Sequence, residues 1–292
     1  MNDRGRTDLP TAAALGVTLV FWGSAFPFIR LALADYQPGH LTLLRFLVAS
    51  AAMWIIARIL RMEPLRVSLW AQPAALSLLN VIGYHVCLNY GLVQVQAGVG
   101  SLIVNTAPVF AYLTAALLFK ERVDGRGWAG LAVSISGTAL IALGSGGRLS
   151  LNAGALLLLC SAIAWGASAA LVRPMLRTMT ALQAAAVSLW AGTAGLLVFL
   201  PGLIPAVRAA SSAATLSVVY LGVVPIAICY ITWNYTLSRI PATRAVNYTY
   251  LIPLIAIIEG YLILGERPGG IALFGGLIAL SGVLLANGGR RP

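Results

Sequence analysis

The chain has 292 residues, of which 60% are hydrophobic and only 9% are charged. Soluble domains usually carry about 25% charged residues, so this composition cannot cover a water-facing surface and lipid must solvate much of the chain. The net charge of +11 could suggest nucleic acid or an anionic surface as a partner. The placement of these charges along the chain favours a different explanation.

Apolar runs separated by charges or turn residues predict ten membrane spans with short connections. A helix needs about 20 apolar residues to cross the hydrocarbon core of a bilayer. The expected spans are residues 12–33, 39–62, 71–92, 98–119, 126–144, 153–173, 180–200, 214–236, 242–264 and 269–287. The expected fold class is therefore an all-α integral membrane protein.

Lysine and arginine are unevenly distributed between the two ends of these spans. With the N-terminus in the cytoplasm, 14 basic residues fall on the cytoplasmic side and 4 on the outside, while Arg45 lies within a span. Cytoplasmic loops of membrane proteins carry an excess of basic residues. We therefore expect a multi-pass protein of the cell (inner) membrane with both termini in the cytoplasm, and a nucleic-acid role becomes unnecessary.

The second half of the chain repeats residues of the first half in the same order. Trp22 and Arg30 recur as Trp165 and Arg173 at an offset of 143. Pairs at an offset of 145 are Asn89 with Asn234, Pro108 with Pro253, Glu121 with Glu266, Gly130 with Gly275 and Gly137 with Gly282. Residues 1–147 and 148–292 are thus predicted to be two five-helix repeats of one membrane domain. Because five is odd, the second copy enters the membrane from the opposite side, an arrangement typical of transporters whose solute site lies between the halves.

Several short motifs spread over the chain carry a family resemblance. They are Trp22-Gly23-Ser24, Leu44-Arg45-Phe46, Ala107-Pro108-Val109, Lys120-Glu121-Arg122, Trp165-Gly166, Ile252-Pro253-Leu254 and Gly265-Glu266-Arg267. With these motifs the whole chain resembles the EamA branch of the drug/metabolite transporter superfamily. The resemblance implies a ten-helix bundle and membrane transport, often export of amino acids or other metabolites, and it leaves the substrate open.

Polar side chains inside the predicted spans are the candidate solute-binding residues, because they are costly in lipid. His85 and Asn89 share a helix face, and Tyr230 and Asn234 stand at the equivalent positions of the second half. The full candidate set is Trp22, Tyr84, His85, Asn89, Ser101, Asn105, Trp165, Tyr230, Asn234, Asn247 and Tyr250. Together they predict a cavity of amides and aromatic rings, suited to a neutral or zwitterionic solute. The same residue types also join neighbouring transmembrane helices, and this second interpretation stays open.

Two further pairs of residues receive structural roles. Pro108 and Pro253 are expected to act as hinges, because a proline inside a helix removes a hydrogen bond. Arg45 and Glu259 lie at similar depths near the outer ends of their spans. They are expected to form an ion pair, or else to reach the outer headgroups separately.

These observations favour a transporter that exports small neutral or zwitterionic metabolites, such as amino acids, by alternating access. The alternative is proton-coupled export of cationic or lipophilic drugs, which needs a carboxylate near the membrane centre, and the first span has none. The absence of a central carboxylate favours facilitated diffusion or exchange, with His85 as the group that could titrate.

An enzyme is not expected, because the sequence contains no HExxH or GxSxG motif and no paired acids. The cysteines Cys87, Cys160 and Cys229 lie in apolar segments without metal-binding spacing, so no metal and no cofactor are expected. The expected partners are the small-molecule solute and membrane lipids, with no nucleic acid. A monomer is expected rather than a dimer.

Overall fold

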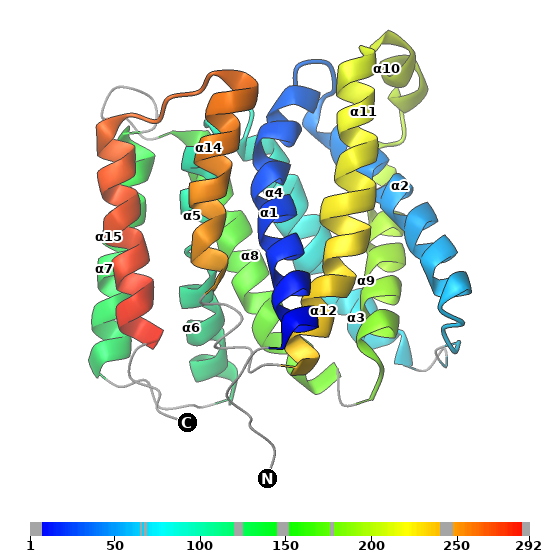
Figure 1. The fold of residues 1–292 in the computed structure, drawn as a ribbon, viewed down its shortest axis with the longest axis horizontal. Coiled ribbons are helices and arrows are strands. Elements are labelled where there is room, and N and C mark those ends of the chain that lie inside the picture. The colour runs from blue at the N-terminus through cyan, green and yellow to red at the C-terminus, as the bar shows by residue number, and fades with distance from the viewer. Residues whose placement is uncertain are drawn as a thin grey trace.

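The computed structural model describes residues 8–64, 66, 69–119, 125–144, 152–175, 178–239 and 248–287. Within these ranges the secondary structure is helical, without strands, and the helices group into ten spans that match the expected ones (Figure 1). The first half contains α1 (Leu9–Ala32), α2 (Pro38–Ile59), the span α3 (Ala71–Ser77), η2 (Leu78–Gly83) and α4 (Tyr84–Gly91), the span α5 (Ala97–Val104) and α6 (Ala107–Phe119), and α7 (Gly125–Gly144).

The second half follows the same order of spans, with one addition. It contains α8 (Ala153–Met175), α9 (Ala181–Leu196) with η3 (Leu197–Phe199), the span α11 (Ser212–Leu221), η4 (Gly222–Ile228) and α12 (Cys229–Arg239), η5 (Thr249–Leu251) with α14 (Ile252–Leu264), and α15 (Gly270–Asn287). The addition is the short helix α10 (Leu203–Ala209) between α9 and α11, which the sequence analysis does not predict.

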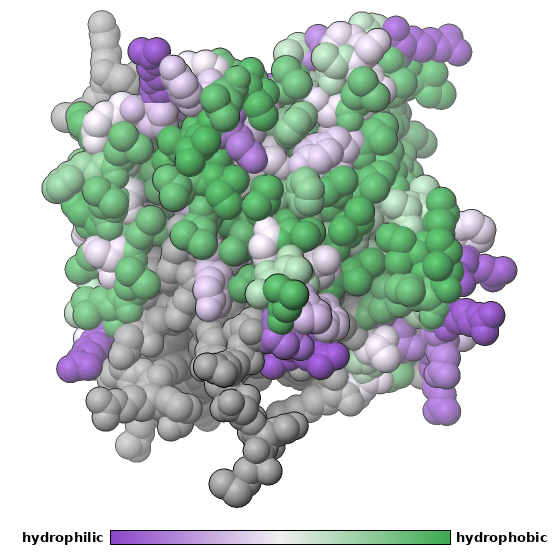
Figure 2. All heavy atoms as spheres, in the orientation of Figure 1, coloured by the Kyte–Doolittle hydropathy of each residue, from purple (hydrophilic) through white to green (hydrophobic). Residues whose placement is uncertain are grey.

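The surface of the bundle is that of a membrane protein. Figure 2 shows apolar side chains across the middle of one face and hydrophilic ones gathered along its upper and lower edges. Leu117, Leu262 and Leu277 are 76%, 73% and 68% exposed. Five described helical stretches are long and apolar enough to cross a bilayer without interruption. An apolar belt of this extent is stable only in lipid, which confirms the prediction of an all-α integral membrane protein.

Short polar side chains define where several helices begin. The Asp8 carboxylate accepts the backbone N–H of Thr11 at the start of α1 (3.2 Å). Thr180 and Gln183 form a reciprocal capping box at the start of α9. Such caps satisfy backbone N–H groups that have no partner within the helix, and each cap contributes about 1 kcal/mol to the stability of the folded protein.

The two halves run through the membrane in opposite directions. In Figure 1, α1 rises from the lower edge to the upper edge. The N–H of Gly154, at the start of α8, bonds to the side chain of Gln94 in the turn after α4 (3.2 Å), so α8 begins at the face where α4 ends. The described chain begins with α1 and ends with α15 at the same lower face, as an inverted repeat of five spans requires.

Equivalent residues of the two halves meet each other at the centre of the bundle. The meeting pairs are Trp22 with Trp165 (ring centroids 5.9 Å apart), Ser50 with Thr193 (hydroxyl oxygens 2.8 Å apart) and His85 with Tyr230 (Nε2 to hydroxyl oxygen, 3.3 Å). Residues related by a two-fold operation touch each other only where the axis passes between them. A pseudo-two-fold axis therefore runs through the middle of the bundle.

The crossing of α7 and α15 obeys the same pseudosymmetry. A Cβ atom added to Gly137 would lie 2.3 Å from the backbone nitrogen of Ala279, and one added to Gly282 would lie 2.3 Å from that of Ser134. Position 137 is equivalent to 282 and position 134 to 279, so the two contacts are copies of one another. Glycine lets the backbones approach closely where lipid gives no hydrophobic drive for association.

The irregular segments within the spans do not coincide with Pro108 and Pro253, whose role as hinges stays a prediction. Pro108 and Pro253 are the second residues of α6 and α14. Their missing N–H groups would have no helical partner there, so neither proline breaks an interior hydrogen bond. The irregular segments are instead the π-helical turns η2 and η4, at equivalent positions in the two halves, and the turn at residues 105–106. π-helical turns inside α-helices are frequently found at functional sites.

Candidate functional site

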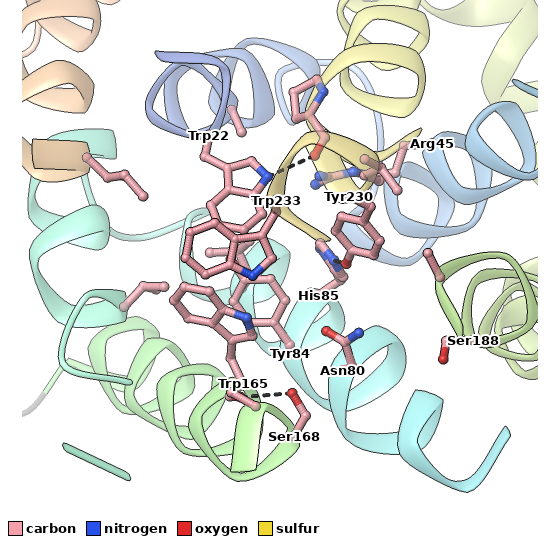
Figure 3. Close-up of a pocket in the computed structure, with 18 of the residues that line it drawn as sticks. Trp22, Arg45, Asn80, Tyr84, His85, Trp165, Ser168, Ser188, Tyr230 and Trp233 are labelled. Carbon is pink, nitrogen blue, oxygen red and sulfur yellow. Dashed lines mark hydrogen bonds between the residues drawn. The ribbon is translucent and has the colours of Figure 1, made fainter. Parts of the chain in front are cut away.

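A cavity of about 190 Å³ lies on the pseudo-two-fold axis and is walled by helices of both halves (Figure 3). The sequence-predicted site residues in its wall are Trp22, Tyr84, His85, Asn105, Trp165 and Tyr230. These residues are brought together from five different spans, so the cavity exists only when the two halves are assembled. That they bind a solute stays a prediction.

One end of the cavity is aromatic. Trp22 meets Trp165 edge to face, and the ring centroids of Trp22 and Trp233 are 5.2 Å apart. Tyr84 stacks on Trp165 with a centroid distance of 5.8 Å. The Trp22 indole N–H donates to the carbonyl oxygen of Pro225 in η4 (3.0 Å), which fixes the ring. Aromatic faces of this kind can hold apolar groups or an ammonium group.

The other end of the cavity is polar, and it holds Arg45, His85 and Tyr230 (Figure 3). Arg45 is only 2% exposed, and its Nη1 donates to Oδ1 of Asn89 over 3.3 Å. Asn89 is held in turn by a bond from its Nδ2 to the hydroxyl of Thr42 (2.7 Å). The guanidinium is therefore positioned by a side-chain relay within the first half.

Three buried polar atoms of the cavity wall have no hydrogen-bond partner: Nε of Arg45, Nδ1 of His85 and Oδ1 of Asn105. The other amide atom of Asn105, Nδ2, donates to the carbonyl of Ser101 (2.9 Å), so the Asn105 side chain is oriented by the last turn of α5. Nearly all buried polar atoms in proteins are bonded. The three unpartnered atoms therefore give the cavity wall donors and acceptors that a bound solute could use.

Two predicted site residues lie outside the cavity wall. Asn89 is fully buried behind Arg45, and its contacts orient the guanidinium. Ser101 is also fully buried, and its hydroxyl donates to the carbonyl of Gly98 within α5. Asn247 lies outside the described residues, as do the side chains of Asn234 and Tyr250.

The predicted ion pair between Arg45 and Glu259 is wrong. No oxygen of Glu259 lies within 4.0 Å of the Arg45 guanidinium, because α2 packs mainly on α4, α9, α11 and η4 whereas α14 packs on α1 and α5. Equal depth gives two residues the same position along the membrane normal, but it does not determine the direction in which each side chain points from its helix. Arg45 turns toward the centre of the bundle instead.

The ion pair that does form joins Arg30 to Glu266 across the two halves, with Nε and Oε1 2.5 Å apart. Arg30 also donates to the carbonyls of Leu92 (2.7 Å) and Val95 (3.0 Å) in the turn between α4 and α5. The second Glu266 oxygen accepts the N–H of Ala97, the first residue of α5 (2.6 Å). We call these five residues the upper clamp. Glu266 thus caps a helix of the other half.

The cavity wall is buried next to the upper clamp. Ile29 and Leu88, which line the cavity there, are 0% and 3% exposed. Ala169, a lining residue in the second half of α8, is exposed. The cavity is therefore closed beneath the clamp.

Several lining residues are absent from the sequence prediction: Asn80, Ser168, Ser188, Trp233 and apolar residues such as Phe26 and Val104. Some of them carry a usable signal. Ser188 stands at offset 143 from Arg45, and Ser168 follows Trp165 by one helical turn. The apolar lining residues cannot be told from core residues by pattern, because both occupy inward helix faces.

Comparisons with known proteins agree with the fold. The sequence profile of the EamA-like transporter family matches residues 11–143 and again residues 152–288. A "Probable terminal-alkyne amino-acid exporter" of Streptantibioticus cattleyicolor is 38% identical over 94% of this chain and 92% of its own length. A "Probable amino-acid metabolite efflux pump" of Escherichia coli is 25% identical over 94% of each chain. A protein crystal structure with 21% identity superposes with a TM-score of 0.62 over 93% of this chain and 95% of that chain, a likeness of fold alone.

Proposed function

The chain belongs to the EamA-like transporter family, and we propose that it exports amino acids or similarly small zwitterionic metabolites by alternating access. Membership of this family makes it a membrane transporter and not an enzyme. The observation that carries the proposal is the cavity on the pseudo-two-fold axis, with an aromatic end and a polar end. A zwitterion with an organic side chain needs both surfaces. The names of the two relatives agree with this solute class.

The composition of the cavity wall disfavours the alternative of proton-coupled drug export. The described lining residues include no carboxylate, and their charged group is the guanidinium of Arg45. A fixed positive charge in a low-dielectric cavity repels a cationic drug. The cavity also offers no acidic group that could exchange a proton for such a solute.

Alternating access requires the closed end to open while the open end closes. The upper clamp is the closure of the present state, and its residues come from both halves. The repeat supplies equivalents for its ion pair: Arg173 for Arg30 and Glu121 for Glu266. We expect Arg173 and Glu121 to form the corresponding clamp at the lower face in the alternate state. Glu121 and the side chain of Arg173 lie outside the described residues.

Orientation in the membrane follows from the distribution of basic residues. We place the lower face of Figure 1, where α1 begins and α15 ends, on the cytoplasmic side of the inner membrane. We also propose that the protein is a monomer in this membrane. We propose that the cavity opens to the cytoplasm in this state, where it can collect solutes for export. The partners in this proposal are the solute and membrane lipids.

Counterflow with purified protein in liposomes tests the proposal. Liposomes are loaded with one unlabelled amino acid, and entry of the same labelled amino acid is followed over a panel of side chains. We expect counterflow above that of protein-free liposomes for at least one apolar amino acid, and its loss in Trp22→Ala. Trp128→Ala is the matched control, because Trp128 is 54% exposed on the outside of the bundle. Absence of counterflow over the whole panel would contradict the proposal.

A further inference from the structure

Arg45 is a buried charge without a counter-charge. Within the described part of the chain, no carboxylate oxygen comes within 4.0 Å of its guanidinium. Among the described residues, the guanidinium donates one long hydrogen bond of 3.3 Å to the neutral amide of Asn89, and its Nε has no partner. Burying an unpaired charge is among the most costly arrangements in a protein, and an ionisable side chain inside a membrane usually has a functional role.

A counter-charge for Arg45 could be supplied by a group bound in the cavity. Arg45 lines the cavity, so a group bound there can reach the guanidinium. A guanidinium presents its N–H groups as a planar fork that matches the two oxygens of a carboxylate. Asn89 accepts a bond from one end of the fork and is itself held by Thr42, and neither residue lines the cavity.

We propose that Arg45 binds the carboxylate of the transported solute and thereby restricts transport to solutes with one carboxylate. The inference rests on the proposed function, because it names the residue that selects the solute class. A single guanidinium neutralises a single carboxylate, and the equivalent position in the second half is the neutral Ser188, which also lines the cavity. Dicarboxylates and phosphate esters would leave a charge uncompensated.

The remaining wall fits the other groups of an α-amino acid. Oδ1 of Asn105 is a buried acceptor without a partner, and an ammonium group is a donor without an acceptor. Asn105 lines the same cavity as Arg45. The solute is then held with its carboxylate at Arg45, its ammonium group toward Asn105 and its side chain among the indole rings.

The first test uses the wild-type protein alone. For the amino acid with the largest counterflow, inhibition of labelled uptake is compared for three unlabelled compounds: the amino acid, its carboxamide and the decarboxylated amine. We expect the amino acid to compete at least tenfold better than either analogue, since only the amino acid carries the carboxylate. Equal competition by the carboxamide would overturn the inference while leaving the exporter in place.

The second test changes the charge. Arg45→Gln should lose the preference for the acid over the carboxamide, and Arg45→Lys should keep part of it. Arg208→Gln is the matched control, because Arg208 is exposed on α10. A purely structural role of Arg45 would lower competition by all three compounds together and leave their ratio unchanged, which would contradict the inference.

A binding measurement separates this result from misfolding. The amino acid should raise the unfolding temperature of detergent-solubilised wild-type protein and of the Arg208→Gln control, and it should not raise that of Arg45→Gln. An equal rise in Arg45→Gln would overturn the inference. If Arg45→Gln does not fold, the wild-type comparison of acid and carboxamide decides. Absence of counterflow in the wild type would overturn the proposed function and this inference with it.

Discussion

The two halves of the bundle are alike in packing and unlike in chemistry. Trp22 meets its equivalent Trp165, and the α7–α15 crossing repeats the same glycine contact on both sides of the axis. In the cavity wall, by contrast, Arg45 has the neutral Ser188 as its equivalent in the second half. Like packing allows two interchangeable conformations of similar free energy. From the unlike chemistry we expect a bound solute to keep one preferred orientation in both conformations.

The largest effect is expected where the packing is symmetric. Gly137→Leu and Gly282→Leu each place a side chain into the backbone of the facing helix, since even a Cβ atom would lie 2.3 Å from it. Overpacking costs about 1–3 kcal/mol where neighbours can move, and more where the obstacle is backbone. We expect both variants to lower the unfolding temperature strongly and to a similar extent. Fluorescence-detected size-exclusion after heating measures this.

Gly16→Leu is the control for that pair, because no atom lies within 4 Å of a Cβ added to Gly16 in α1. We expect its unfolding temperature to stay near the wild-type value. A large effect of Gly137→Leu beside a small effect of Gly282→Leu would contradict the equivalence of the two contacts.

The fold was largely predictable because hydrophobic length and internal duplication leave direct traces in the sequence. Each expected span has a helical counterpart, and the repeat offsets of 143 and 145 anticipate which residues meet on the axis. The π-helical turns η2 and η4 leave no such trace. Leu78–Gly83 contains Asn80, and Gly222–Ile228 contains Pro225, but neither hydrophobic length nor the repeat predicts a π-helical turn at these residues.

The site was predictable only in part, because a span boundary gives depth and not direction. Trp22, His85 and Tyr230 were found through their repeat positions, and they line the cavity. Arg45 was assigned a partner by depth alone, and the structure turns it elsewhere. The pair of Arg30 and Glu266 was missed because its partners are far apart in the sequence and because each also bonds backbone groups that no sequence pattern reveals.

Exchanging the unlike residues of the two halves tests the chemical difference directly. We expect Arg45→Ser to reduce counterflow at least tenfold, and the double variant Arg45→Ser with Ser188→Arg to recover part of it. Recovery should be incomplete, because Ala185 stands where Thr42 supports the relay in the first half. Counterflow of the best amino acid measures both. Full recovery would show that the solute does not depend on the Asn89–Thr42 relay.

A smaller, opposite pair of effects is expected from the two clamps. Arg30→Gln removes an ion pair and two bonds to carbonyls at the upper face, which contributes about 1–2 kcal/mol to the present state. The cavity should then spend less time open at the lower face. Arg173→Gln should leave this state populated or favour it further.

A cysteine placed at Ala169 in a background without Cys87, Cys160 and Cys229 reports this equilibrium through its reaction with a membrane-impermeant thiol reagent at the lower face. We expect Arg30→Gln to slow the reaction several-fold and Arg173→Gln not to slow it. Arg267→Gln is the neighbouring control, since its side chain lies over the ring of Tyr261 outside the clamp. Slowing by both Arg30→Gln and Arg173→Gln would contradict the exchange of clamps between halves.

The smallest effect is expected from a pH gradient. The cavity wall contains no carboxylate among the described residues, and its imidazole is that of His85. Its ring lies against Phe46 and Tyr84 (centroids 4.7 and 4.5 Å away), and a second positive charge would share the cavity with Arg45. We therefore expect no accumulation of labelled neutral amino acid above its equilibrium level when a pH gradient is imposed on the liposomes. Accumulation that disappears in His85→Gln would identify His85 as a coupling residue, and the transport would then be proton-linked instead of driven by the solute gradient alone.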